Sequence, residues 1–190
     1  MTGTFASDTE ISRLAAALQE DGREDLAEID TMLVGYPDDP RLHFMRGSVL
    51  AAASRPIEAH AALTRAVEIA PDYRIARYQL GFFELTSGEA GRALATWGPL
   101  LVAPDDDYLR IFVEGMTHLI RDEFTPAIEK FRKGCLLNDE NEPLNNDIRL
   151  LIGEILRQVN SGAKEAAGTP GDLSATSLIL EQFGGDRLLN

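Results

Sequence analysis

Apolar residues along this 190-residue chain recur at the three- and four-residue intervals of an α-helix. Helix-forming residues such as Ala, Leu, Glu and Arg are common, and stretches rich in β-branched residues are few. Short polar segments, most of them next to a Gly or Pro, separate the apolar stretches and mark turns. The pattern predicts helices in four pairs, at 8–20 and 23–34, 40–53 and 56–70, 73–86 and 89–102, and 107–121 and 125–137.

Small residues are placed regularly within these pairs. A glycine in the first helix, an alanine in the second and a large apolar residue one turn after the alanine each recur at one constant interval. These residues are Gly47, Gly81 and Gly115; Ala59, Ala93 and Ala127; and Leu63, Trp97 and Phe131. Two antiparallel helices pack closely only where a small residue lies at their crossing, and the large residue one turn further on fills the space beside it. The interval of about 34 residues is typical of helix-turn-helix solenoid repeats.

The order of these residues resembles the tetratricopeptide repeat (TPR) family, whose pattern has a small residue, then Ala, a large residue, another small residue and a helix-ending Pro. The matching residues are Gly47, Ala59, Leu63, Ala66 and Pro71 in one unit, Leu80, Gly81, Gly88, Ala93, Trp97 and Pro104 in the next, and Gly115, Phe124, Ala127, Phe131 and Gly134 in the third. Pro104 comes one position early, and an earlier, degenerate unit ends at Pro37. The resemblance implies an all-α fold, a right-handed α-α superhelix (TPR solenoid) over residues 8–137, with three good repeats and one degenerate repeat.

The chain after the last repeat is predicted to have three parts. A helix at 144–160 carries apolar residues at helical spacing and would cap the last repeat by covering its apolar face. These residues are Ile148, Leu151, Ile152, Ile155, Leu156 and Val159. Residues 161–174, rich in Gly and Ala, predict a flexible linker, and residues 175–190 an apolar C-terminal tail.

One irregularity falls inside a predicted helix. Gly98 and Pro99 lie within the second helix of the third pair. Proline removes a backbone donor and clashes with the carbonyl of the preceding turn. We therefore expect this helix to kink or to end early.

The formal net charge of −13 argues against nucleic-acid binding, because phosphate contacts require clustered Lys and Arg. Acidic residues instead gather near predicted helix starts, at Asp38 and Asp39, at Asp105 to Asp107, and at Asp139, Glu140 and Glu142. Carboxylates there cap free N–H groups and favour the positive end of the helix dipole, so we interpret them as caps rather than as a cation site. No apolar run approaches membrane-spanning length, and the single cysteine fits a cytoplasmic protein.

Residues that could carry chemistry are few and do not converge. His43, His60 and His118 occupy three different positions within the repeat, and Cys135 aligns with the apolar Val67 and Leu101. A nucleophilic pair or a zinc site needs neighbouring partners that this register does not supply. The sequence therefore predicts a protein that is not an enzyme and has no catalytic residues, metal or cofactor.

Function is then expected from a surface. In TPR proteins the first helices of the repeats line the concave face, where partner peptides lie. The resemblance places these apolar residues in such a groove: Phe44, Ile75, Tyr78, Phe82, Leu85, Leu109, Phe112, Met116 and Leu119. Phe44, Tyr78 and Phe112 replace the Lys and Asn residues with which chaperone-binding TPRs hold a C-terminal carboxylate. His43, Arg77 and Glu84 occupy positions that are normally buried, so the alternative interpretation places the apolar stripe in the core.

The expected function is a non-catalytic protein-binding adaptor or scaffold that holds an apolar segment of a protein or peptide in this groove. One alternative is a cytosolic chaperone resembling those of type III secretion translocators, and another is a self-assembling structural or regulatory subunit. Leu178, Ile179 and Phe183 of the tail are predicted to dock, because exposed apolar clusters are unfavourable in water. They would enter the groove of their own chain or of a second copy, and the latter would give a homodimer.

Overall fold

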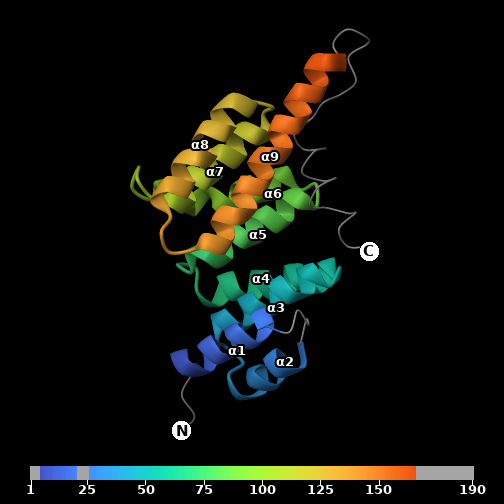
Figure 1. The fold of residues 1–190 in the computed structure, drawn as a ribbon. Coiled ribbons are helices and arrows are strands. Elements are labelled where there is room, and N and C mark those ends of the chain that lie inside the picture. Colours follow the sequence, from blue (N-terminus) through green and yellow to red (C-terminus); the bar gives the residue numbers. More distant parts are fainter. Residues whose placement is uncertain (1–4, 21–25, 166–190) are drawn as a thin grey trace. The chain divides into compact units, whose positions relative to one another are not determined.

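The computed structural model describes residues 5–20 and 26–165, and within them all regular structure is helical (Figure 1). The helices are α1 (Asp8–Glu20), α2 (Leu26–Gly35), α3 (Pro40–Ala52), α4 (Pro56–Ile69), α5 (Arg74–Thr86), α6 (Ala90–Trp97), the 3-10 helix η1 (Gly98–Val102), α7 (Tyr108–Ile120), α8 (Phe124–Leu137) and α9 (Glu142–Glu165). The prediction of an all-α protein is thus confirmed for the described part of the chain.

The chain divides into two compact units, Met1–Phe83 and Glu84–Asn190, and the boundary falls inside α5. In unit 1, α3 packs against α4 and also contacts α1 and α2. In unit 2, α7 packs against α8, and α8 contacts α9 (Figure 1). Each unit therefore contains one closely packed helix pair.

The turn inside a helix pair has the same backbone structure at three places, whose spacing equals that of the repeated glycines. Ser54, Gly88 and Asp122 all have left-handed backbone angles, with φ of 57°, 84° and 60°. At each turn this residue donates to the carbonyl three residues back, and the next residue donates to the carbonyl five residues back, as from Arg55 to Leu50 at 2.9 Å. This is the Schellman ending of a helix. The backbone turns therefore repeat at the same interval as the small residues in the sequence.

The helix starts repeat in the same way. The carbonyls of Asp39, Tyr73, Asp107 and Asn141 accept from the N–H groups of His43, Arg77, Ile111 and Asn145. Side chains cap three of these starts: Asp39 accepts from Arg41 N–H at 3.0 Å, Asp107 from Arg110 N–H at 2.9 Å, and Asn141 from Leu144 N–H at 3.1 Å. Capping by the first two acidic groups is confirmed. The third cap is the neutral Asn141 rather than Asp139, Glu140 or Glu142.

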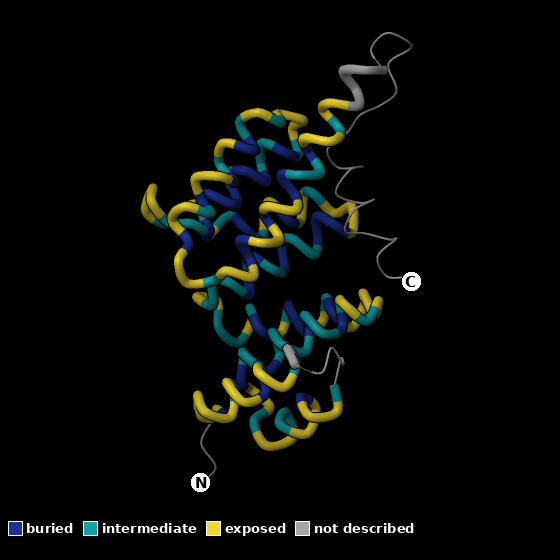
Figure 2. The backbone as a smooth tube through the Cα atoms, in the orientation of Figure 1, coloured by how far each residue is buried: buried dark blue, intermediate teal, exposed yellow. Residues whose placement is uncertain are grey.

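The repeated small residues lie where the paired helices touch. A Cβ built on Gly47 would lie 2.6 Å from Leu63 Cγ, and one built on Gly115 would lie 2.5 Å from Phe131 Cε1. The alanines and large residues of the pattern are fully buried. They form part of the buried interior of each unit that Figure 2 shows in dark blue. Gly47 and Gly115 thus make room for the large residue of the next helix.

The early end of the helix before Gly98 agrees with the prediction, whereas the length of α9 does not. The helix with Gly98 and Pro99 ends early, as predicted, since α6 stops at Trp97 and the chain continues as η1. In contrast, α9 is longer than predicted and runs to Glu165, so its last turn occupies residues that we expected to begin the linker. Its buried Asn145 donates to the carbonyl of Asn138 at 2.8 Å, which fixes α9 to the end of α8.

Candidate partner-binding surface

Most of the predicted groove residues are interior. Six of the nine are buried, namely Tyr78, Leu85, Leu109, Phe112, Met116 and Leu119. A buried side chain cannot contact a partner unless the protein rearranges. The predicted groove is therefore reduced to its three partly exposed members, Phe44, Ile75 and Phe82.

The burial in unit 2 follows from the position of α7. Its buried residues, Leu109, Ile111, Phe112, Val113, Gly115, Met116 and Leu119, cover more than one side of the helix. It contacts α6 and η1 as well as α8. A helix that is apolar on most of its surface is a core helix. For α7 the structure therefore favours the alternative interpretation, in which the apolar stripe belongs to the core.

The three partly exposed residues all belong to unit 1. Phe44 of α3 meets Tyr73, the residue before α5, edge to face, with ring centroids 5.5 Å apart and planes at 64°. Burial raises the pKa of the Tyr73 hydroxyl. Ile75 and Phe82 are two helical turns apart on α5, so they lie on one face of that helix. We call Phe44, Tyr73, Ile75 and Phe82 the exposed apolar set. The sequence analysis did not identify Tyr73 as a groove residue, although the predicted helix 73–86 began there; in the structure α5 begins one residue later, at Arg74.

The polar residues at nominally buried positions have their own explanation. The His43 ring lies 2.8 Å from the carbonyl of Pro37, and the Arg77 guanidinium donates to the carbonyl of Pro71 at 2.9 Å. These two contacts occupy the same position in successive repeats, and each ties a first helix to the turn before it. Glu84, which is buried, accepts from the Thr96 hydroxyl at 2.6 Å. All three polar residues therefore have structural partners.

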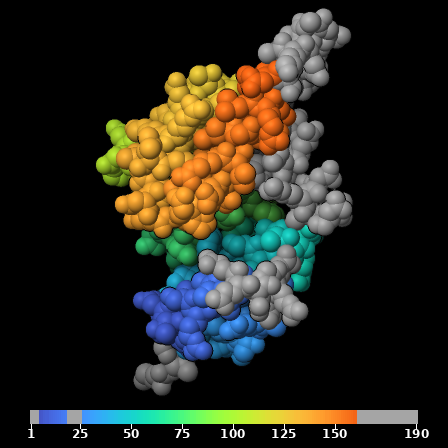
Figure 3. Space-filling model, viewed as in Figure 1, coloured from blue at the N-terminus to red at the C-terminus, as the bar shows by residue number. Residues whose placement is uncertain are grey.

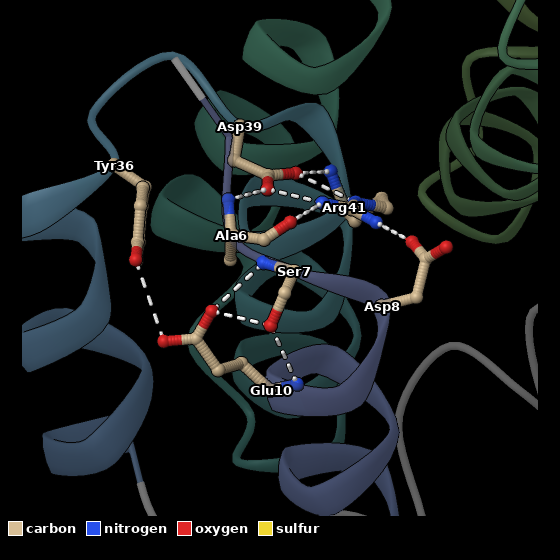
Figure 4. Close-up of polar contacts among 7 residues, drawn as sticks. All are labelled: Ala6, Ser7, Asp8, Glu10, Tyr36, Asp39 and Arg41. Carbon is tan, nitrogen blue, oxygen red and sulfur yellow. Dashed lines mark hydrogen bonds and ion pairs between the residues drawn. The ribbon is translucent and has the colours of Figure 1, made fainter. Parts of the chain in front are cut away.

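A polar cluster around Asp39 and Arg41 anchors the N-terminal segment (Figure 4). Asp39 is fully buried and accepts from the backbone N–H of Ala6 at 2.9 Å and from the Arg41 guanidinium at 2.7 Å. The same guanidinium donates to the carbonyl of Ala6 and, at 2.7 Å, to Asp8. Burial by itself raises the pKa of Asp39, but the bonds from Arg41 and Ala6 outweigh it and hold the pKa below its ordinary value.

The start of α1 forms the second half of this cluster. Ser7 and Glu10 exchange hydrogen bonds in a capping box, with the Ser7 N–H donating to Glu10 at 2.8 Å and the Glu10 N–H donating to Ser7 at 3.3 Å. The Tyr36 hydroxyl donates to Glu10 at 3.3 Å. These contacts tie the N-terminal segment and the start of α1 to Tyr36 and to the start of α3, so we assign the cluster a structural role.

The residues capable of chemistry lie apart. His60 lies against Phe83 with ring centroids 6.3 Å apart, and His118 pairs with Glu123 across the turn after α7 at 2.5 Å. Cys135 is partly buried, which raises the pKa of its thiol. Within residues 5–20 and 26–165, no group of three or more His, Cys, Asp or Glu side chains is placed to hold a metal ion.

Comparison with known proteins gives no further guide to identity. No family model matches the chain, and no curated protein sequence matches it. Among the described helices, none combines the length and apolar character needed to cross a bilayer. The predicted docking residues Leu178, Ile179 and Phe183 lie outside the described residues.

Proposed function

We propose that this protein is a non-catalytic, TPR-like helical-repeat protein that binds a partner protein or peptide through the exposed apolar set of unit 1. The observation that carries the proposal is the edge-to-face pair of Phe44 and Tyr73, which stays partly exposed, whereas Phe112, the equivalent of Phe44 in α7, is buried. Aromatic side chains that are rigid and partly exposed are the usual anchors of protein interfaces.

The repeat architecture supports the same proposal. The turns at Ser54, Gly88 and Asp122 recur with the period of the sequence pattern, and so do the helix starts. Repeats of this period present the faces of successive first helices to a partner, and Phe44, Ile75 and Phe82 occupy first helices. An apolar, aromatic surface suits the apolar face of an amphipathic helix or an extended apolar segment.

The test compares partner retention by matched surface variants. The tagged chain and its Phe82→Asp and Phe44→Asp variants are used to capture proteins from an extract of the native cell. Ile57→Asp is the control, because Ile57 is an exposed apolar residue of α4 outside the proposed surface. We expect a specific protein to be retained by the wild type and by Ile57→Asp and lost from the other two variants.

Melting temperatures decide whether such a loss is informative. An aspartate on a partly exposed surface should leave the melting temperature nearly unchanged, whereas a buried, unpaired charge costs several kcal/mol. A large drop in melting temperature for Phe82→Asp and Phe44→Asp would show that both residues are core and would refute the proposed surface. Equal retention by all four proteins would refute it as well.

A further inference from the structure

A row of apolar residues on α9 is left uncovered by the described part of the chain. Leu150, Leu156 and Val159 are 51%, 38% and 42% exposed, and a Cβ built on Gly153 would meet nothing within 4 Å. These four residues follow one another at intervals of three, so they form one i±3 row inclined to the helix axis. We call them the α9 row. Figure 3 shows the outer surface of α9, in orange, beside α8.

Gly153 gives this row the shape of a packing site. In the α3–α4 and α7–α8 pairs a glycine of the first helix contacts the large residue of the second, Gly47 with Leu63 and Gly115 with Phe131. Gly153 lies in the interior of a 24-residue helix, where glycine is less favourable than alanine. A dip flanked by Leu150 and Leu156 fits a bulky apolar side chain from a crossing segment.

The repeat period indicates what is missing beside α9. The helix starts at Asn141 with the same backbone bond as the starts at Asp39, Tyr73 and Asp107. It thus begins as the first helix of a further pair. The turn of that pair would fall at residues 155–157, by the spacing of the earlier turns, but α9 continues to Glu165. A second helix is therefore absent from its usual place among the described residues.

We propose that residues 175–183 of the same chain dock on the α9 row and cover it. This segment contains Ile179 and Phe183, which are four residues apart and share one face if the segment turns as a helix. One of these side chains would fill the dip at Gly153. The proposal does not depend on the proposed function of unit 1.

The chain between α9 and the segment has the reach that docking requires. Gly153 precedes Glu165 by about 12 residues, which corresponds to about 18 Å along the helix. Residues 166–174 supply nine residues, whose root-mean-square span as a flexible chain is about 17 Å. Residues 166–174 are therefore long enough for the segment to reach the row. The short tether also gives an effective concentration of about a millimolar, which favours docking within one molecule.

The test is chemical cross-linking between α9 and the segment in the full-length protein. Cys135→Ser removes the native thiol, and Asn160→Cys with Thr176→Cys introduces one thiol on exposed α9 surface and one in the segment. A short bismaleimide is added, and products are separated by denaturing electrophoresis. We expect an intramolecular product in high yield. Gly153→Arg should lower that yield at least about tenfold by filling the dip, whereas Gly153→Ala should keep it.

Each other outcome overturns the proposal. An equal yield with Gly153→Arg would show that the segment does not use the row. Cross-linked dimers whose yield rises with protein concentration would assign the row to the segment of a second copy. If Gly153→Arg fails to fold by circular dichroism, Leu150→Glu replaces it, since Leu150 is exposed and outside the core. An unchanged yield in that variant refutes the docking.

Discussion

Gly47 lies directly against Leu63, so closely that a Cβ on Gly47 would come within 2.6 Å of Leu63 Cγ. Gly115 stands in the same relation to Phe131, two repeats further along the chain, although the large residue is aromatic there. The α3–α4 and α7–α8 pairs thus share one packing solution. The size of the glycine, rather than its backbone freedom, is what the packing requires at both places.

Replacing Gly115 should therefore destabilise the protein although alanine is the better helix former. We expect Gly115→Ala to lower the free energy of unfolding by about 1–3 kcal/mol, because the new methyl group must displace the Phe131 ring. Urea denaturation followed by circular dichroism measures the change. Gly91→Ala is the control: a Cβ there meets nothing within 4 Å, so this variant should be neutral or slightly more stable.

A double variant tests the cause. Phe131→Leu recreates in α7–α8 the pair that α3–α4 uses, and it should reduce the cost of Gly115→Ala. If the costs of the two single variants add up to the cost of the double variant within about 0.5 kcal/mol, the two residues do not interact. That result would contradict the contact that the structure shows.

The left-handed turns give a second prediction. Gly88 has φ of 84°, a conformation that alanine adopts only at a cost. We expect Gly88→Ala to lower the free energy of unfolding by about 1–2 kcal/mol. Gly88→Asn should cost less than half as much, because asparagine tolerates this conformation. If thermal melts show that the two variants lose equal stability, the left-handed backbone angle at Gly88 is not the cause of the loss.

Two phenylalanines of the predicted groove should differ in how much stability is lost when they are replaced by alanine. Phe112 is fully buried and lies against Gly134, so Phe112→Ala should cost about 3–5 kcal/mol of unfolding free energy. Phe44 is partly exposed, and Phe44→Ala should cost less than about 2 kcal/mol. Chemical denaturation of both variants checks the ranking, and a reversed order would contradict the assignment of α7 to the core.

The buried Asp39 predicts a pH-dependent contribution to stability. Its pKa is lowered in the folded protein, so the carboxylate stabilises the fold above the ordinary pKa of about 3.9. That stabilisation is lost as the pH falls through the lowered value. Asp39→Asn should therefore cost about 2–3 kcal/mol near neutral pH, and the difference from wild type should shrink below about pH 4.

The neighbouring acid serves as the control for that experiment. Asp38 is exposed and pairs with Arg65 at the surface at 2.8 Å, so Asp38→Asn should cost less than about 1 kcal/mol. Urea titrations of both variants between neutral and acidic pH give the comparison. If the difference in unfolding free energy between Asp39→Asn and wild type stays constant down to about pH 3, the Asp39 carboxylate is not the source of that difference.

The elements were predictable because their signals are local. The spacing of the glycines and alanines reports helix contacts within a pair, and Pro99 reports a helix end in its own turn. The length of α9 was underestimated because Gly162 and the polar residues after Val159 are typical of a linker. A helix that begins in a packed region can continue through residues whose composition is typical of a linker, because extending a helix costs less than starting one.

The surface was predicted less well, for a reason that is also physical. Leu109, Phe112 and the other groove residues of α7 have the same residue types whether they face a partner or the core. Which of the two applies depends on α6 and η1, whose contacts with α7 follow from the early helix end at Trp97. The N-terminal cluster was also not predicted, since Ala6 and Asp39 are 33 residues apart and the bond from Ala6 comes from its backbone.

The contact between Gly47 and Leu63 also bears on how the chain is made. The two partners are close in sequence, so the entropy lost on closing the loop between them is small. The α3–α4 pair can therefore collapse on the microsecond to millisecond scale of local helical folding, soon after synthesis has delivered Ile69. By contrast, Ala6 finds its carboxylate partner only after Asp39 has been synthesised. The segment at the start of α1 can therefore complete its contacts only after the start of α3 has been synthesised.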